Sequence, residues 1–197
     1  MKRNIYIGFL ILLLSFTAWG NSWGKDWTID PNHSAIQFNV KHIFSTVFGS
    51  FSDFSAEIRF DPEKLDQSSF DFEVQVKSVN TGNGKRDNHL RSKDFFGADK
   101  YPIMTFKSSN IRHKEGKTYW VSGVMTLKKI SKSMEMPFVF HGIVPSPFNK
   151  KQEIIGFDTG FSLDRLAFGV GNGKFHKMGV VGDKVEVVIS VEAIGDR

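Results

Sequence analysis

The sequence of 197 residues contains no cysteine. It therefore cannot form a disulfide, supply a thiolate to zinc, use a cysteine nucleophile or carry a lipid on an N-terminal cysteine. Net charge is also small, because 26 Lys and Arg residues face 21 Asp and Glu residues scattered along the chain. The clustered basic face that nucleic-acid binding requires is absent. Apolar residues make up 40% and charged residues 24%, which is typical of a single folded domain.

Long apolar runs are scarce, and the one at Ile5–Phe16 stands near the start of the chain. It follows two basic residues and precedes small residues, the pattern of a secretory signal peptide. At this length it is too short to span a membrane, which needs about 18 apolar residues. We therefore predict a signal peptide over residues 1–24, cleaved after Gly20 or Gly24. The remaining domain, residues 25–197, has 24 basic residues against 21 acidic ones.

Phenylalanine is abundant, with 20 residues, and much of it alternates with polar residues. Strict alternation indicates strands with one buried face and one solvent-exposed face. It is clear in Ser34–His42, Phe54–Phe60, Phe70–Val76 and Lys184–Ala193, and weaker in Ile103–Ser108, Thr118–Leu127, Met134–Ile143 and Ile154–Leu163. Short connections make these strands mostly antiparallel. About eight one-sided strands, several of them about 30 Å long, predict an all-β, eight-stranded antiparallel barrel rather than a sandwich.

One segment, Asn80–Pro102, breaks the alternation and contains a helix-compatible stretch at Lys85–Ser92. We predict a short helical insertion here. It either forms a lid over one barrel mouth or acts as a plug that completes the core. The plug interpretation would use the apolar side chains Leu90, Phe95 and Phe96 and a structural pairing of Arg86 with Asp87.

The inward face of the predicted barrel is apolar and aromatic. Its members are Ile36, Phe38, Val40, Phe72, Val74, Phe106, Phe138, Phe140, Phe157 and Phe161, with His42 following at the rim. A barrel of eight strands is either just filled by side chains or holds one small ligand. Alternation alone does not distinguish these two cases, so a ligand tunnel and a solid core both remain open.

Signals for catalysis or metal binding are weak. The six histidines show no metal-ligand spacing, and neither a G-x-S-x-G motif nor a glycine-rich dinucleotide loop is present. We therefore predict no metal, no covalent cofactor and no enzymatic activity. The alternative is an enzyme that acts on the occupant of the barrel, with His42, Arg86, Asp87 or His89 at the mouth.

Several ordered blocks of the sequence resemble one known family. They comprise Trp27–Ser34 with Ile36–His42, Gly49–Phe51, Asn80–Asn83, Arg86–Ser92, Asp94–Phe96, Lys100–Pro102 with Thr105 and Phe106, Val121–Leu127, Arg165 with Phe168 and Gly169, and Gly182–Val185. In this order they are similar to the YceI-like family over essentially the whole chain after residue 24. Two turns depart from the family pattern: Lys128–Lys132 lacks a glycine, and Leu163–Arg165 is a loose match.

The resemblance implies a lipocalin-like barrel, exported to the periplasm, that holds a long isoprenoid or an isoprenoid quinone. The expected ligand residues are then the inward set and His42 given above. The expected partners are the lipid itself and, for a quinone carrier, a membrane redox protein. The protein would act as a monomer or a homodimer. A filled barrel with a purely structural or interaction role remains the third possibility.

Overall fold

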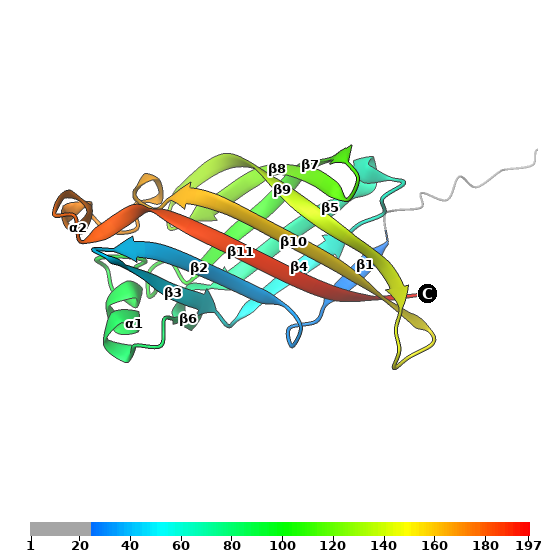
Figure 1. Ribbon diagram of the computed structural model, residues 1–197, viewed down its shortest axis with the longest axis horizontal. Helices are drawn as coiled ribbons and strands as arrows, with labels where there is room; N and C mark the ends of the chain where they lie inside the picture. Colours follow the sequence, from blue (N-terminus) through cyan, green and yellow to red (C-terminus); the bar gives the residue numbers. More distant parts are fainter. Residues whose placement is uncertain (1–24) are drawn as a thin grey trace, which may run out of the picture.

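Eight antiparallel strands form a closed barrel in the computed structural model, which describes residues 25–197 (Figure 1). Going around the ring, they are β1 (Asp26–Ile29), β4 (Phe54–Arg59), β5 (Ser69–Gln75), β7 (Ile103–Glu115), β8 (Thr118–Leu127), β9 (Ile130–Pro145), β10 (Gln152–Asp164) and β11 (Val181–Asp196). The ring closes where Thr28 of β1 pairs with Ile194 of β11. The predicted barrel is therefore confirmed. The predicted signal peptide, residues 1–24, lies outside the described residues.

Three further strands, β2 (Ala35–His42), β3 (Ser45–Phe51) and β6 (Val79–Asn80), extend one end of the barrel. β2 pairs with the first part of β11 while β1 pairs with its last part, so β1 and β2 lie end to end along a single long strand. β1 and β3 are absent from the strands that alternation identifies.

The helical insertion is confirmed as α1 (Gly84–Arg91), which follows β6. Asn83 caps this helix, because its side chain accepts a hydrogen bond from the backbone N–H of Arg86. A four-residue helix, α2 (Lys174–Lys177), and three 3₁₀ segments complete the fold, at Leu65–Gln67, Val76–Ser78 and Leu166–Phe168. Within residues 25–197, no helix has the length and apolar character needed to cross a membrane.

Both helices lie at one end of the barrel, here called the helical end, and the C-terminus lies at the other, the C-terminal end (Figure 1). Between the two ends, β9 and β10 change register at Gly156 and Phe157. Gly142, opposite the shift, has a φ of +123°, a conformation in which a side chain would be strained. Such a bulge bends the strand pair and lets long strands wrap around a barrel.

The buried side chains form two clusters along the barrel axis. The cluster of the C-terminal end is centred on Phe60, with Trp27, Tyr119, Ile155 and Ala193 among its members. The cluster of the helical end contains these residues: Ile36, Phe51, Val74, Val76, Val79, Phe95, Ala98, Met104, Leu127, Phe168 and Val170. The space between the two clusters holds the candidate site.

Candidate functional site

An apolar cavity of about 220 Å³ opens inside the barrel between the two clusters. Every strand of the ring except β1 contributes to its wall, as do β2 and β3, and the insertion that carries α1 covers it with Leu90 and Phe96. Almost its entire surface is carbon. A cavity of this chemistry stays dry, and its lining atoms lack the dispersion contacts that a packed core would provide. A hydrocarbon guest would restore those contacts.

Most of the inward set predicted from the alternation lines this cavity. The lining members are Ile36, Phe38, Val40, Phe72, Val74, Phe106, Phe138, Phe157 and Phe161. Alternation assigned these residues to the inner face because side chains two residues apart on a strand point to the same side.

The two remaining predicted residues, His42 and Phe140, are not among the residues that line the cavity. His42 ends β2, where it pairs with Ser45 and Val181 at the rim. Phe140 lies two residues beyond Phe138 and packs into the cluster of the C-terminal end. Alternation identifies which face a residue occupies, but it does not say how far along the barrel axis the residue lies.

Several lining residues were missed by the sequence prediction. Val185, Val187, Ile189 and Val191 form the inner face of β11, and the alternation of Lys184–Ala193 was the signal that could have found them. Three methionines also line the cavity, Met104, Met125 and Met136. Their flexible thioether side chains adapt readily to guests of different shape.

The C-terminal end is solid. Phe60 is fully buried, and the centre of its ring lies 5.1–6.1 Å from the ring centres of five neighbours. These neighbours are Phe70, Tyr119, Phe138, Phe140 and Phe157. Most of the contacts are tilted or edge-to-face, the geometry that aromatic rings prefer. Rings from opposing walls meet here, so the cavity has a closed floor.

The insertion combines features of the predicted lid and plug. Leu90 and Phe96 face the cavity and also pack against the cluster of the helical end. The predicted pairing of Arg86 with Asp87 is wrong, because both side chains bind Thr81 instead. Asp87 accepts hydrogen bonds from the N–H and hydroxyl of Thr81, at 2.9 and 2.6 Å, and Arg86 donates to the hydroxyl and carbonyl oxygens of Thr81. A loop residue in reach of both makes a direct ion pair unnecessary.

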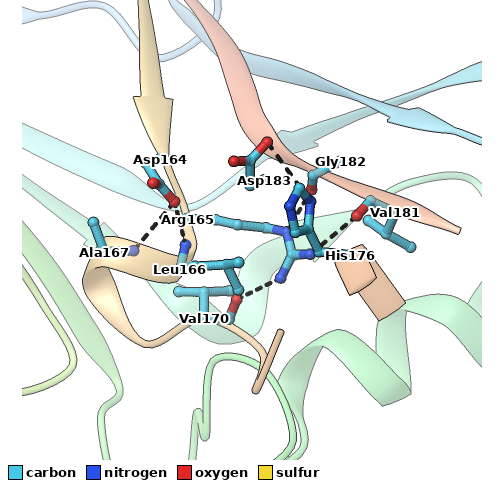
Figure 2. A network of polar contacts seen from close by, with 9 residues as sticks. All are labelled: Asp164, Arg165, Leu166, Ala167, Val170, His176, Val181, Gly182 and Asp183. Atoms are coloured by element: carbon cyan, nitrogen blue, oxygen red, sulfur yellow. Dashed lines mark hydrogen bonds and ion pairs between the residues drawn. The ribbon is translucent and has the colours of Figure 1, made fainter. Parts of the chain in front are cut away.

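One charged side chain, Arg165, is buried at the helical end with only 6% of its surface exposed. It follows β10 and donates three hydrogen bonds to carbonyl oxygens, those of Gly182, Val170 and Val181, at 2.7, 2.7 and 3.3 Å (Figure 2). Burial lowers the pKa of the guanidinium, and the nearby carboxylates of Asp183 and Asp164 oppose this effect. An arginine stays charged in such surroundings, so the helical end holds a fixed positive charge.

A second, polar pocket of about 190 Å³ lies beside this arginine. Its lining residues are His89, Asp94, Phe95, Arg165, Gly171, Asn172, Gly173, Lys174 and Phe175. Phe95 and Arg165 also line the apolar cavity and so separate the two spaces. Within residues 25–197, no group of three histidine or carboxylate side chains is placed to hold a metal ion.

A closed antiparallel barrel with one solid end and an apolar cavity under a helical cover belongs to the class of small ligand-holding barrels. The family model of the YceI-like domain matches residues 27–193. The chain belongs to the YceI-like family, as its sequence blocks predict.

Known relatives match this chain over most or all of their length. Protein YceI of Salmonella arizonae and protein YceI of Salmonella enteritidis PT4 are each 28% identical to this chain over 200 residues, covering 100% of both proteins. Among solved structures, BcnA of Burkholderia cenocepacia is 29% identical, with a TM-score of 0.75 over 83% of this chain and 98% of its own. The YceI protein of Campylobacter jejuni is 31% identical, with a TM-score of 0.68 over 80% of this chain and 89% of its own.

A more distant structure shares the fold alone. It is described as a polyisoprenoid binding domain from Saccharophagus degradans implicated in plant cell wall breakdown. It is 13% identical to this chain, with a TM-score of 0.64 over 87% of this chain and 99% of its own.

Proposed function

We propose that this protein carries or stores a long isoprenoid or isoprenoid-quinone lipid, whose hydrocarbon tail occupies the apolar cavity. The observation that carries the proposal is the cavity itself, a space of about 220 Å³ with a carbon surface inside an otherwise well-packed barrel. Its wall includes the nine residues given above, from Ile36 to Phe161, which we propose as ligand contacts. The name of the Saccharophagus degradans domain, which has the same fold, is consistent with such a ligand.

Physical chemistry favours a long apolar guest. Each methylene group moved from water into this cavity gains about 0.8 kcal/mol, so a chain of several isoprene units offsets the motion that it loses on binding. The methionines and the half-buried phenylalanines of the wall, such as Met125 and Phe161, adapt to the branched methyl groups of a prenyl chain.

The arrangement of polar residues supports binding rather than catalysis. Of the residues considered for an enzyme, Arg86 and Asp87 are engaged with Thr81, and His42 ends β2 at the rim. His89 lies in the polar pocket, where its nearest carboxylate is that of Asp94, at 3.7 Å. These groups do not converge on one point of the apolar cavity, as a nucleophile and its base would have to do.

The proposal includes a location and partners. A cleaved signal peptide over residues 1–24 would place the protein in the periplasm, where a lipid with a long tail needs shelter from water. The lipid would be the only bound cofactor, and none would be covalent. A quinone carrier of this kind would exchange its cargo with a membrane redox protein, acting as a monomer or a homodimer.

Mass spectrometry of organic extracts from the natively purified protein tests this proposal. We expect a prenyl lipid or quinone in near-stoichiometric amount, and displacement of a hydrophobic fluorescent probe by quinone analogues. Reproducible absence of any prenyl or acyl lipid, together with no binding of the analogues, would overturn the proposal. The enzyme alternative predicts a changed lipid after prolonged incubation, so recovery of the unchanged lipid argues against it.

A further inference from the structure

The partition between the apolar cavity and the polar pocket consists of Phe95 and Arg165, which line both spaces. The carbon atom at the centre of the Arg165 guanidinium lies 5.9 Å from the centre of the Phe95 ring. The polar pocket therefore lies next to one end of a ligand that fills the apolar cavity. Only the Phe95 ring and the Arg165 guanidinium separate the two.

The cation of this partition has spare hydrogen-bonding capacity. A guanidinium has five N–H donors, and three of them bind carbonyl oxygens of the chain. Within residues 25–197, Arg165 forms no ion pair, because no carboxylate oxygen lies within 4.0 Å of its nitrogens. Two N–H donors thus remain for a partner that the chain does not supply.

The carboxylates around Arg165 are already engaged. Asp164 accepts hydrogen bonds from the backbone N–H groups of Leu166 and Ala167, and Asp183 lies 3.8 Å from the ring of His176 (Figure 2). Each carboxylate therefore has its own partner and acts on Arg165 only through its charge, without a hydrogen bond.

Two other charged groups line the polar pocket, Lys174 and Asp94. Lys174 is exposed and, within the described residues, has no carboxylate within 4.0 Å. Asp94 faces His89 at 3.7 Å. Arg165 and Lys174 together thus outweigh the single carboxylate. A further ammonium group, that of Lys128, binds the carbonyl oxygens of Phe95 and Gly169 nearby, at 2.8 and 2.7 Å.

The chain also leaves room beside the arginine. Gly171 lines the polar pocket, and a Cβ atom built on it would lie 2.5 Å from one terminal nitrogen of Arg165. Any side chain at this position would therefore block that nitrogen. The glycine keeps the guanidinium accessible from the polar pocket.

We propose that the polar pocket binds an anionic oxygen head group, a phosphate or a carboxylate, of the lipid whose tail fills the apolar cavity. Arg165 and Lys174 are its donors, with Phe95 packed against the first segment of the tail. The proposal rests on the proposed lipid-binding function and names the ligand class more closely. A charged acceptor suits the site because hydrogen bonds between two ionised groups are about twice as strong as neutral ones.

Ligands with one tail and different head groups test this inference. Geranylgeranyl phosphate, geranylgeranoic acid and geranylgeraniol would each be titrated against a bound hydrophobic fluorescent probe. We expect the preferred acid to bind about tenfold more tightly than the alcohol, the difference that one charged hydrogen bond provides. The phosphate and carboxylate arms identify which acid the pocket prefers. Equal affinity for all three would overturn the head-group site and leave the lipid carrier standing, whereas no binding of any of them would overturn both.

Substitutions of two pocket residues test whether the preference for an acidic head group arises in the polar pocket. Lys174→Gln changes an exposed residue, and we expect it to weaken acid binding about threefold with the alcohol unaffected. Arg165→Gln should abolish the preference for the acid, but it also removes three contacts that hold the loop.

A pair of glycine variants gives a second test in which the side chain of Arg165 is kept. Gly171→Ala places a methyl group against Arg165, whereas Gly179→Ala, at a similar positive φ, places one in open space. Both variants place alanine at a positive φ, +83° and +68°, so the difference between them reports the crowding of Arg165, which the added methyl group would approach most closely. We expect Gly171→Ala alone to reduce the ratio of acid to alcohol affinity. An unchanged ratio in both Lys174→Gln and Gly171→Ala would refute the assignment.

Discussion

The two ends of this barrel are built from the same residue types and differ in what those residues contact. At the C-terminal end, Phe60 is enclosed by five aromatic rings. Toward the helical end, Phe38 and Phe161 are half-buried and border the cavity. A phenylalanine thus stabilises the fold at one end and shapes a binding space at the other. The difference comes from position along the barrel axis, since the alternating pattern is the same in both places.

Replacing one phenylalanine at each end gives the largest expected effect. Phe60→Ala should lower the free energy of unfolding by about 3–5 kcal/mol, because it leaves a void among packed rings. Phe161→Ala should cost about 1 kcal/mol, because part of its ring already faces a cavity. Denaturant titration of both variants measures these values. Equal losses would mean that the two ends are packed alike.

Filling the cavity should weaken lipid binding without harming the fold. Val187→Phe adds a ring to the inner face of β11, next to the cavity, and excluding about two methylene groups of the guest lowers its affinity about tenfold. Val188→Phe adds the same ring one residue further on, where the side chain is half exposed on the outer face. Probe displacement should separate the two variants. If both bind lipid as the unmodified protein does, the tail lies elsewhere.

Two turns at the helical end should respond in opposite directions to the same substitution. Ile43 and Lys128 are the non-glycine residues with positive φ among the described residues, at 51° and 58°. Ile43 is an exposed β-branched residue in the left-handed region, which Asn adopts at a lower cost. Ile43→Asn should therefore raise the free energy of unfolding by about 1 kcal/mol. Lys128→Asn should lower it by about 2 kcal/mol, since the bonds to Phe95 and Gly169 are lost. Thermal unfolding checks both signs, and stabilisation by Lys128→Asn would contradict the role given to its ammonium group.

The smallest effect concerns the outer wall between the two ends. The hydroxyl of Ser190 and then the ring of His141 donate to Asp158 and lower the pKa of its carboxyl group below the ordinary value of 3.8. Its ionised form therefore stabilises the fold fully above pH 3.8, and this contribution is lost as the pH falls through the lowered pKa. The stability advantage over Asp158→Asn should be small and constant near neutral pH, and it should shrink below pH 3.8. An advantage that grows in acid would contradict this assignment.

Much of the fold follows from the sequence, because alternation directly reports a strand with one buried face. Segments without alternation were missed for local reasons. β1 has four residues, and β3 mixes Ser45, Gly49 and Ser50 among its apolar members, so neither shows the period of two. The number of barrel strands agrees with the prediction, but β1 takes the place in the ring that the sequence would assign to β2.

The site was only half predictable. The inner face could be identified, whereas the boundary between solid core and cavity could not, since it depends on where Phe60 and its partners meet in three dimensions. Arg165 was singled out only through its family resemblance. Its burial depends on the carbonyl oxygens of Val170, Val181 and Gly182, and main-chain acceptors leave no mark in a sequence.

Because the C-terminal end is solid, the apolar cavity is closed at that end. A lipid chain cannot pass through the barrel from end to end. It would enter with the apolar end of its tail first and leave with its polar end first. Under the proposed function, the polar end of the lipid would therefore lie at the helical end, and a partner that exchanges the lipid would act on that side of the barrel.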